Sequence, residues 1–313
     1  MPTVSVVIPF HRKYYLSRLI ESILNNDFPE NNIEIILIDN SLTNEIYNEI
    51  VDKFKDKNII IIRKSKPMLV SESRNIGIIS SRGKYILLID DDNIISRNMI
   101  KNLVSVMESD PSIGVTAPAM YYLKNPNRIW CISVRRNMYT SITRFITEVG
   151  KKVSNDQLIP SDDFPNCFMI RRSVLEEVGL FDQDDFPMHY EEADLCARIR
   201  RNGYKIVCVL TAKVWHDVPL NQVRYFANWF RSPLSPRSYY SSRNRIIFHR
   251  RYSTLAQFVI FISIFNWVVS LYYIFIIFLF TKMGITDKLK VVKNYLNGIL
   301  DGIISRKRKW MVE

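Results

Sequence analysis

The hydrophobic pattern of the first 120 residues repeats one simple alternation. Short apolar runs of strand length, rich in β-branched residues, occupy residues 4–9, 33–39, 59–63, 85–89 and 113–117. Longer stretches with apolar positions at helical spacing lie between them, for example residues 15–25, 45–54 and 71–81. Alternating strands and helices are typical of a parallel, doubly wound sheet, so we expect an α/β fold.

The region from residue 121 to about residue 218 is less regular. Residues 167–170 predict a strand and residues 173–178 a short helix that ends at Gly179. A second helix begins near Glu191 and runs to residue 201, with Gly203 as its stop. Residues 206–210 and 212–215 predict two further strands, the second of which ends at His216.

A long apolar stretch follows. Residues 255–280 contain no charged side chain and exceed the ~20 residues that cross a bilayer. Trp267, Tyr272 and Tyr273 lie in the middle of the stretch, whereas aromatic belts mark the ends of a span. A membrane span, a hairpin broken near Asn266, an interfacial helix and a soluble core helix all stay open. We expect truncation after about Pro236 to release a folded soluble domain.

The end of the chain predicts a basic amphipathic helix suited to an anionic membrane surface. Its apolar stripe is Leu289, Val292, Leu296, Ile299, Leu300 and Ile303, flanked by Lys288, Lys290 and Lys293 and followed by the basic run 306–309. Basic residues on both sides of the apolar stretch suit a hairpin better than a single crossing. The chain then divides into an α/β domain at 1–225, a basic juxtamembrane segment at 226–253, a transmembrane or re-entrant segment at 254–281 and a tail helix at 285–313.

Composition narrows the classes of partner. A chain of 313 residues with 47% apolar residues can hold one large domain and an appendage. The net charge of +12 suits nucleic acid, an anionic membrane or a phosphorylated substrate. The basic clusters at 237–251 and 282–309 flank the apolar stretch, so we expect a membrane surface and no nucleic acid. Four separated cysteines without a Cys-x-x-Cys pair indicate a reducing compartment and no zinc site. The N-terminus lacks the pattern of a signal peptide.

Asp90, Asp91 and Asp92 directly follow the apolar run 85–89. Adjacent carboxylates at a buried strand end repel one another unless positive charge sits between them. A divalent cation is one candidate, because hard cations take carboxylate oxygens and keep places for substrate phosphates. The alternative is a helix N-terminus over residues 93–108, where acidic residues favour the helix dipole.

Other polar positions stand at predicted strand or helix ends. Asp39 closes the second strand, where its carboxylate suits a nucleotide base or ribose, or the cap of the next helix. Arg74 follows the third strand, where it could pair with a phosphate or face solvent. Glu191 and Glu192 precede a helix whose dipole they would satisfy. A lone His216 is commonly structural. No Gly-x-Gly-x-x-Gly follows the first strand, so the dinucleotide fingerprint is absent.

The order of these pieces resembles glycosyltransferase family 2, which has the GT-A fold. The resemblance spans about residues 3–250, and its pieces are Val4-Ser-Val-Val-Ile-Pro9, Ile38-Asp39-Asn40-Ser41, Arg74-Asn75-Ile-Gly77, Asp90-Asp91-Asp92-Asn93, Tyr190-Glu-Glu-Ala-Asp194 and Val214-Trp-His216. Within the family it is most similar to the rhamnosyl- and galactofuranosyltransferase branch. That likeness rests on Gly179-Leu-Phe-Asp182, Glu191-Glu-Ala-Asp-Leu195, Arg198, Gly203-Tyr204, Tyr239-Tyr240 and Arg243-Asn244.

The resemblance implies a role for each matched residue. Pro9 and Asp39 would line the nucleotide site, and Arg74 with Asp91 would hold the ribose and phosphate region. Asp92, with Asp90 and His216, would hold Mg²⁺ or Mn²⁺. Glu192 matches the position of the catalytic base, supported by Glu191. The family usually has Asp at that position, so either the acceptor lies further away or the base is Glu191 or Asp194.

Together these residues predict a membrane-attached inverting glycosyltransferase at the cytoplasmic leaflet. Its donor would be a nucleotide-sugar and its acceptor a hydroxyl of a glycan or lipid-linked acceptor, deprotonated by the carboxylate while a cation neutralises the diphosphate. A polyprenyl-phosphate glycosyltransferase is the alternative, since its ionised acceptor needs no base. A catalytically inactive nucleotide-sugar-binding membrane protein is a third possibility. The identities of sugar, nucleotide and acceptor do not follow from the motifs.

Overall fold

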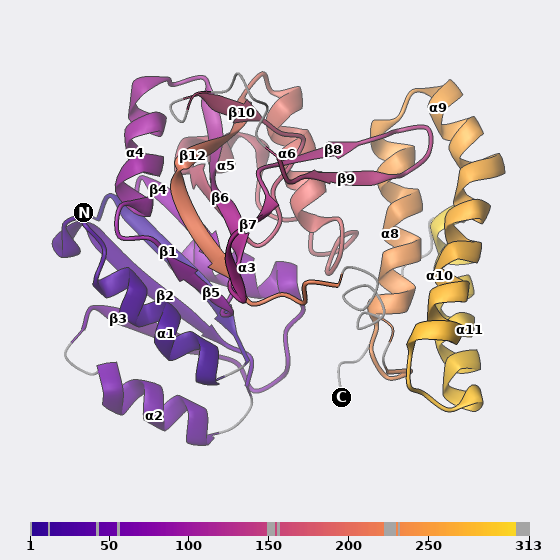
Figure 1. The fold of residues 1–313 in the computed structure, drawn as a ribbon, viewed down its shortest axis with the longest axis horizontal. Coiled ribbons are helices and arrows are strands. Elements are labelled where there is room, and N and C mark those ends of the chain that lie inside the picture. The colour runs from indigo at the N-terminus through magenta and orange to yellow at the C-terminus, as the bar shows by residue number, and fades with distance from the viewer. Residues whose placement is uncertain are drawn as a thin grey trace.

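The computed structural model describes residues 2–304 apart from residues 12, 42–43, 55–56, 149–153, 155–156, 222–229 and 231. The predicted boundary between residues 225 and 226 and the basic run 306–309 lie outside the described residues. A large sheet with its surrounding helices forms one part of the molecule, and a group of C-terminal helices stands beside it (Figure 1).

Within the described residues the main sheet has ten strands, eight of them in the order β10-β12-β6-β11-β4-β1-β2-β3, with β5 paired to β12 and β7 to β6. Their bounds are β1 Val4–Phe10, β2 Ile33–Asp39, β3 Ile59–Arg63, β4 Tyr85–Ile89, β5 Asn93–Ile95, β6 Ile113–Tyr122, β7 Asn125–Cys131, β10 Leu158–Pro160, β11 Cys167–Arg171 and β12 Lys205–His216. A separate hairpin is formed by β8 Ser133–Arg136 and β9 Thr143–Ile146. The helices of this part are α1 Lys13–Leu24, α2 Asn44–Phe54, α3 Val70–Ser80, α4 Met99–Ser109, α5 Arg172–Val178 and α6 Glu191–Arg201, with a short 3₁₀ turn at Glu30–Asn32.

The α/β fold is confirmed, but the sheet is mixed where the alternating pattern predicts a parallel one. Strands β1, β2, β3 and β4 are parallel, and so are β6 and β12. Strand β11 enters between β4 and β6 and is antiparallel to both. A central strand is apolar on both faces whichever way it runs, so the sequence pattern of residues 167–170 does not reveal this direction.

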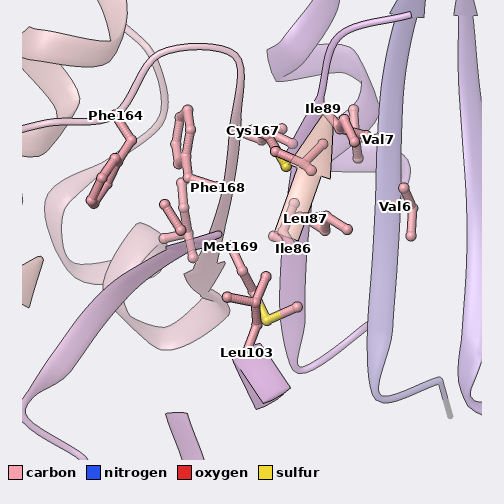
Figure 2. Packing of buried hydrophobic residues seen from close by; sticks show 14 of the residues in the cluster. Val6, Val7, Ile86, Leu87, Ile89, Leu103, Phe164, Cys167, Phe168 and Met169 are labelled. Carbon is pink, nitrogen blue, oxygen red and sulfur yellow. The ribbon is translucent and has the colours of Figure 1, made fainter. Parts of the chain in front are cut away.

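The core lies where central strands meet the helices. Figure 2 shows Ile86, Leu87 and Ile89 of β4 facing side chains of β1 and β11. These side chains are at most 1% exposed, as expected for continuous apolar runs buried on both faces. The rigid sheet therefore fixes the residues that follow its strand ends.

Two predicted elements differ in the structure. The helix expected over residues 93–108 begins only at Met99, because Asn93–Ile95 forms β5 and pairs with β12. The two strands expected at 206–210 and 212–215 are one strand, β12, whose pairing with β6 shifts register between Val209 and Lys213. Residues 210–212 of β12 are extra relative to β6 at this point, and this irregularity does not end the strand.

The C-terminal helices form what we call the helical layer: α8 Arg237–Tyr252, α9 Leu255–Ile260, the π-helical turn η2 Phe261–Phe265, α10 Asn266–Phe280 and α11 Ile285–Ile303. In Figure 1, α8 lies nearest the sheet, with α10 and α11 beyond it. Residues 255–280 form one continuous helix of 26 residues, so the alternative of a segment broken near Asn266 does not hold. The Asn266 side chain is buried instead and accepts a hydrogen bond from Arg245.

Helices α8 and α11 pack closely because Gly298 and Gly302 face α8. A Cβ atom at Gly298 would lie 2.3 Å from the carbonyl oxygen of Tyr239, and one at Gly302 would lie 3.0 Å from that of Arg243. The buried Asp301, between these glycines, accepts a hydrogen bond of 2.9 Å from the Tyr239 hydroxyl. Side-chain-free positions let two helix backbones approach, so the tail helix is fixed along α8.

Candidate active site

The carboxyl ends of the parallel strands share one edge of the sheet. Strands β1, β2 and β4 end there at Phe10, Asp39 and Ile89. Strand β12 is parallel to β6, and β6 has the direction of β4 because β11 is antiparallel to both. His216 therefore reaches the edge that carries the aspartate triplet, the place where open α/β sheets bind ligands.

Arg74 lies at the centre of this edge. Helix α3 can press against β1 because residue 77 is glycine: a Cβ atom there would lie 2.2 Å from Cγ1 of Val7. One turn earlier, the Arg74 side chain is only 3% exposed. Its Nη2 atom lies 2.9 Å from Oε1 of Glu192 and 3.2 Å from Oδ1 of Asp90.

Glu191 is the third carboxylate around this guanidinium. Its Oε1 atom lies 3.5 Å from Nη1 of Arg74. Its Oε2 atom is buried and has no hydrogen-bond partner among the described residues. Three carboxylates therefore share one guanidinium, which leaves the cluster with surplus negative charge.

Burial and crowding change the protonation of this cluster. Burial raises the pKa of Glu192 to about 7, although Arg74 pulls it down, and Glu191 and Asp90 raise it further. Burial also raises the pKa of Glu191, against the pull of Arg74. For Arg74, burial disfavours the charge, but Glu192, Asp90 and Glu191 outweigh it and raise the pKa. A carboxyl group with a pKa near neutrality can exchange protons with a substrate.

Asp92 and His216 meet on the other side of the triplet. Asn93 of β5 pairs with His216 of β12, which brings Asp92 beside the imidazole. Nε2 of His216 lies 3.3 Å from Oδ1 of Asp92, and both side chains are nearly buried. Nδ1 of His216 is buried without a hydrogen-bond partner among the described residues. The Trp130 ring packs edge-on against the imidazole at 4.7 Å.

These two residues fit a cation that takes its remaining ligands from substrate. One carboxylate and one imidazole are suitable donors, and Mg²⁺ in particular binds through one or two carboxylates plus phosphates. Among the residues that the structure describes, no group of three or more His, Cys, Asp or Glu side chains is arranged as a metal site. Asp90, the third predicted ligand, lies against Arg74 instead.

The predicted nucleotide-binding residues are dispersed along the same edge. Asp39 is buried, lies 3.2 Å from Nε of Arg63 and accepts hydrogen bonds from the backbone and hydroxyl of Ser41. Asp91 is also buried and accepts a hydrogen bond of 3.2 Å from the His11 backbone. Pro9 is partly buried near the end of β1, opposite Ile38 of β2. Their roles toward a nucleotide stay predictions.

Asn166 belongs to the site although its sequence context gives little sign of it. Its backbone N–H donates to Oε1 of Glu192 at 3.0 Å. Its side chain exchanges two hydrogen bonds with Asn93, at 2.7 and 3.1 Å. It has a positive φ of 71°, a conformation that Asn tolerates better than most residues. An Asn between a proline and a strand is the available signal, and it is a weak one.

The turn before Glu191 is held from the helical layer. His189 and Tyr190 both have positive φ, 61° and 66°, which costs ~1–3 kcal/mol for each non-glycine residue. The Asn244 amide of α8 donates to the carbonyls of Met188 and His189 at 2.9 and 3.1 Å. These bonds fix the turn from which both glutamates project.

Asp194, the other candidate base, is fully engaged elsewhere. It accepts hydrogen bonds from Arg198 at 3.0 Å, Arg251 at 2.9 Å and the Tyr252 hydroxyl at 2.6 Å. Arg251 also binds Asp182 and Asp185. This group ties α6 to α8, so its geometry is that of a structural ion-pair network.

Known proteins are similar to this chain in sequence or in fold. GlyG, a glycosyltransferase of Streptococcus pneumoniae, is 33% identical over 196 residues, which are 59% of this chain and 64% of GlyG. The mannosyltransferase PcManGT of Pyrobaculum calidifontis, solved with GDP-Man and Mn²⁺, has a TM-score of 0.59 at 12% identity, covering 98% of this chain and 88% of its own. Residues 1–349 of Staphylococcus aureus TarS give 0.53 at 14% identity, covering 99% and 93%.

The sequence relatives are longer than the region they share with this chain. The chain spans 64% of GlyG and 24% of an uncharacterized protein of Sinorhizobium fredii that is 23% identical to it. The two solved structures show the fold, which is the mixed α/β arrangement of GT-A enzymes. The model of the family described as Glycosyl transferase family 2 matches residues 5–179, which include Arg74 and the aspartate triplet. This chain belongs to glycosyl transferase family 2.

Proposed function

We propose that this chain is a metal-dependent inverting glycosyltransferase, attached to a membrane, that moves a sugar from a nucleoside-diphosphate sugar to a hydroxyl group. The observation that carries the proposal is the cluster of Asp90, Glu191 and Glu192 around Arg74, next to the Asp92–His216 pair. Surplus negative charge suits a cation that arrives with a diphosphate. A carboxyl group with a pKa near 7 suits a base.

Glu192 is the proposed base. Its Oε1 atom is held by Arg74 and by the Asn166 backbone, and within the described residues nothing is hydrogen-bonded to Oε2. That oxygen takes the proton of the acceptor hydroxyl as the hydroxyl oxygen attacks the anomeric carbon. Attack from the side opposite the diphosphate inverts the anomeric centre. Arg74 steers Glu192 and favours its charged form, and Glu191 supports the same turn.

Asp92 and His216 are the residues that would hold Mg²⁺ or Mn²⁺, which supplies charge neutralisation to the leaving diphosphate. Asp39 is placed to meet the nucleotide base, and Asp91 the ribose and phosphate region. Pro9 would line the same site. PcManGT was solved with GDP-Man and Mn²⁺, and that pairing supports a nucleotide-sugar with a divalent cation here.

The acceptor we propose is a glycan or lipid-linked hydroxyl, in the manner of the rhamnosyl- and galactofuranosyltransferase branch. Several motifs of that likeness touch one another, since Arg198 donates to the carbonyls of Gly179 and Leu180 and Asn244 binds the turn before Glu191. The helix Leu255–Phe280 is long and apolar enough to cross a membrane, and it supports membrane attachment. All four cysteines are free and buried, which suits catalysis on the cytoplasmic side.

The test is donor turnover by the purified full-length chain. A panel of nucleotide-sugars with Mn²⁺ or Mg²⁺ and hydroxyl acceptors should give release of nucleoside diphosphate, and chelator should abolish it. Glu192→Gln should lower kcat by roughly 10²–10⁴-fold with little change in donor binding. Glu191→Gln is the matched control and should lose less.

Three outcomes would redirect the proposal. Full activity in chelator would remove the metal. Normal turnover by Glu192→Gln together with loss in Glu191→Gln would move the base by one position. If both variants stay active, the acceptor is already ionised, and the polyprenyl-phosphate alternative takes precedence.

A further inference from the structure

The outward face of the helical layer is apolar and exposed. On α9, η2 and α10 the side away from α8 carries Val259, Ile264, Trp267, Leu271, Phe275 and Leu279, which are 48–68% exposed. Helix α11 adds the exposed stripe of Leu289, Leu296 and Leu300, beside the exposed Lys290 and Lys293. An apolar surface of this extent marks an interaction site, and adjoining lysines favour an anionic lipid surface as its occupant.

Helix α8 runs alongside the apolar helix in the opposite direction. The connection between them is two residues long, Ser253 and Thr254, and Thr254 caps α9. The His249 ring stacks on Phe261 at 3.9 Å. One turn earlier in α8, Nη2 of Arg245 lies 3.0 Å from Asn266 and 3.1 Å from Ser270. The two helices are therefore side by side over several turns.

The other side of α8 is built into the catalytic part of the molecule. Asn244 binds the turn before Glu191. Arg251 lies 2.9, 2.6 and 2.9 Å from carboxylate oxygens of Asp182, Asp185 and Asp194. In Figure 1, α8 stands between the sheet and α10 along most of its length. The apolar helix thus lies level with charged groups of the active-site region.

These contacts conflict with a crossing of the bilayer. Helix α8 has 16 residues, a length of about 24 Å, against a hydrocarbon thickness of ~30 Å. If residues 255–280 stood across the membrane, α8 and the Arg251–aspartate network would stand in hydrocarbon beside them. Charged groups at that depth are strongly disfavoured. The helix can contact lipid only through its outward face.

We propose that α9, η2, α10 and α11 lie in the plane of the membrane and attach the enzyme to one anionic leaflet without crossing it. This inference rests on the membrane attachment proposed above. The mid-helix aromatics then have a reason: Trp267 and Tyr272 are 48% and 51% exposed, and in an in-plane helix every position lies at the headgroup level that such side chains prefer. Lys290 and Lys293 face the same headgroups.

The first experiment asks on which side of the membrane residue 282 lies. Lys282 is exposed in the connection between α10 and α11, and all four native cysteines are buried. Full-length Lys282→Cys is expressed in cells and treated with a membrane-impermeant maleimide before and after the membrane is opened. In-plane attachment predicts labelling only after opening, as for the control Lys101→Cys on α4. Labelling of Lys282→Cys alone in intact cells would overturn the proposal.

The second experiment measures depth in vesicles. Spin labels at Val259→Cys, Leu271→Cys and Leu279→Cys on the purified chain, bound to phosphatidylglycerol–phosphatidylcholine vesicles, should all report a similar shallow depth, ~5–10 Å into the boundary between headgroups and acyl chains. A deep label at 271 with shallow labels at both ends would show a crossing. Lys290→Gln and Lys293→Gln should each weaken vesicle binding about fivefold.

Two further outcomes would also overturn the inference. If the chain does not float with vesicles, or if the outward face is protected in a lipid-free dimer and stays off the vesicles, a leaflet is not the occupant. Donor turnover by the same samples is read separately, so these failures are distinguishable from failure of the proposed chemistry.

Discussion

Arg74 of the sheet region, residues 2–221, and Arg245 of the helical layer are both buried, but in opposite ways. In the sheet region Arg74 is surrounded by Asp90, Glu191 and Glu192. In the helical layer Arg245 is 2% exposed, yet its partners are the Asn266 amide oxygen, the Ser270 hydroxyl and the rings of two tyrosines. No carboxylate pairs with it among the described residues.

This difference indicates a chemical role for the surroundings of Arg74 and a packing role for those of Arg245. Around Arg74 the carboxylates outnumber the cation, so protons, metal and substrate can all change the balance. The Arg245 guanidinium is held instead by two neutral polar groups and two ring faces. The two buried arginines should therefore respond differently to the same substitution.

Arg74→Met should have the largest effect. It leaves Glu191 and Glu192 without their counter-charge, and breaking a buried ion pair costs ~3–5 kcal/mol. We expect that loss in the free energy of unfolding, measured by urea denaturation, together with loss of donor turnover. Arg97→Met is the control, since Arg97 is 81% exposed and should change stability by less than ~0.5 kcal/mol. Equal effects in the two variants would contradict the electrostatic account of the site.

Asn244→Ala should come next, because it tests whether the helical layer holds the catalytic turn. Loss of the amide removes its hydrogen bonds to the carbonyls of Met188 and His189, at a cost of ~1–3 kcal/mol. We also expect kcat to fall at least tenfold with donor KM nearly unchanged, because a displaced base loses rate rather than binding. Asn102→Ala is matched, since its amide donates to the Thr211 carbonyl, and it should leave kcat intact. A loss of stability with unchanged kcat would refute the positioning role.

The pH dependence of the cluster should have two opposite signs. The raised pKa of Glu192, about 7, means that its neutral form stabilises the metal-free fold below the unfolded pKa and that this contribution is lost as pH rises through 7. Activity should instead rise, up to about tenfold per pH unit below 7, because the base must be ionised. Profiles of kcat/KM and of unfolding in chelator between pH 5.5 and 8 measure both. Glu192→Gln should flatten the stability slope; an unchanged slope would assign it to another group.

Arg245→Met should have the smallest effect. The substitution removes two hydrogen bonds but strands no opposite charge, and well-packed apolar replacements of buried ionic groups are often neutral. We expect a change below about 1.5 kcal/mol in the free energy of unfolding and near-normal kcat. A loss as large as that of Arg74→Met would contradict the distinction between these two buried arginines.

Local hydrophobic patterns in the sequence predict much of this fold. The runs at 33–39 and 85–89 are strands because largely apolar residues suit a doubly buried sheet position, whereas the run at 59–63 forms a partly buried edge strand. The contact between Arg74 and Glu192 becomes visible only in the folded structure, where both residues lie at one edge of the sheet. Neither the direction of β11 nor the place of Asn166 follows from spacing, since both depend on partners far along the chain.

Residues 237–252 show most clearly what cannot be predicted from the sequence. With five arginines they predict a basic surface segment, yet α8 is buried along nearly all of its length. Arg243 and Arg251 meet Asp182, Asp185 and Asp194, while Arg245 meets neutral groups. Such long-range pairing has no local signature, because a solvated arginine and a paired one look identical in sequence.

The two buried sides of α8 also determine how this protein can be divided. Cutting after Pro236, the truncation expected from the sequence to release a folded domain, would remove Arg251 from Asp182, Asp185 and Asp194. Cutting after Tyr252 would instead uncover Ile246 and Arg245, which α10 and α11 now shield. Neither cut avoids exposing side chains that α8 now buries or pairs. The sheet region and the helical layer are therefore a single structural unit, and a chimaera that exchanges one for a relative's must carry both faces of α8 with it.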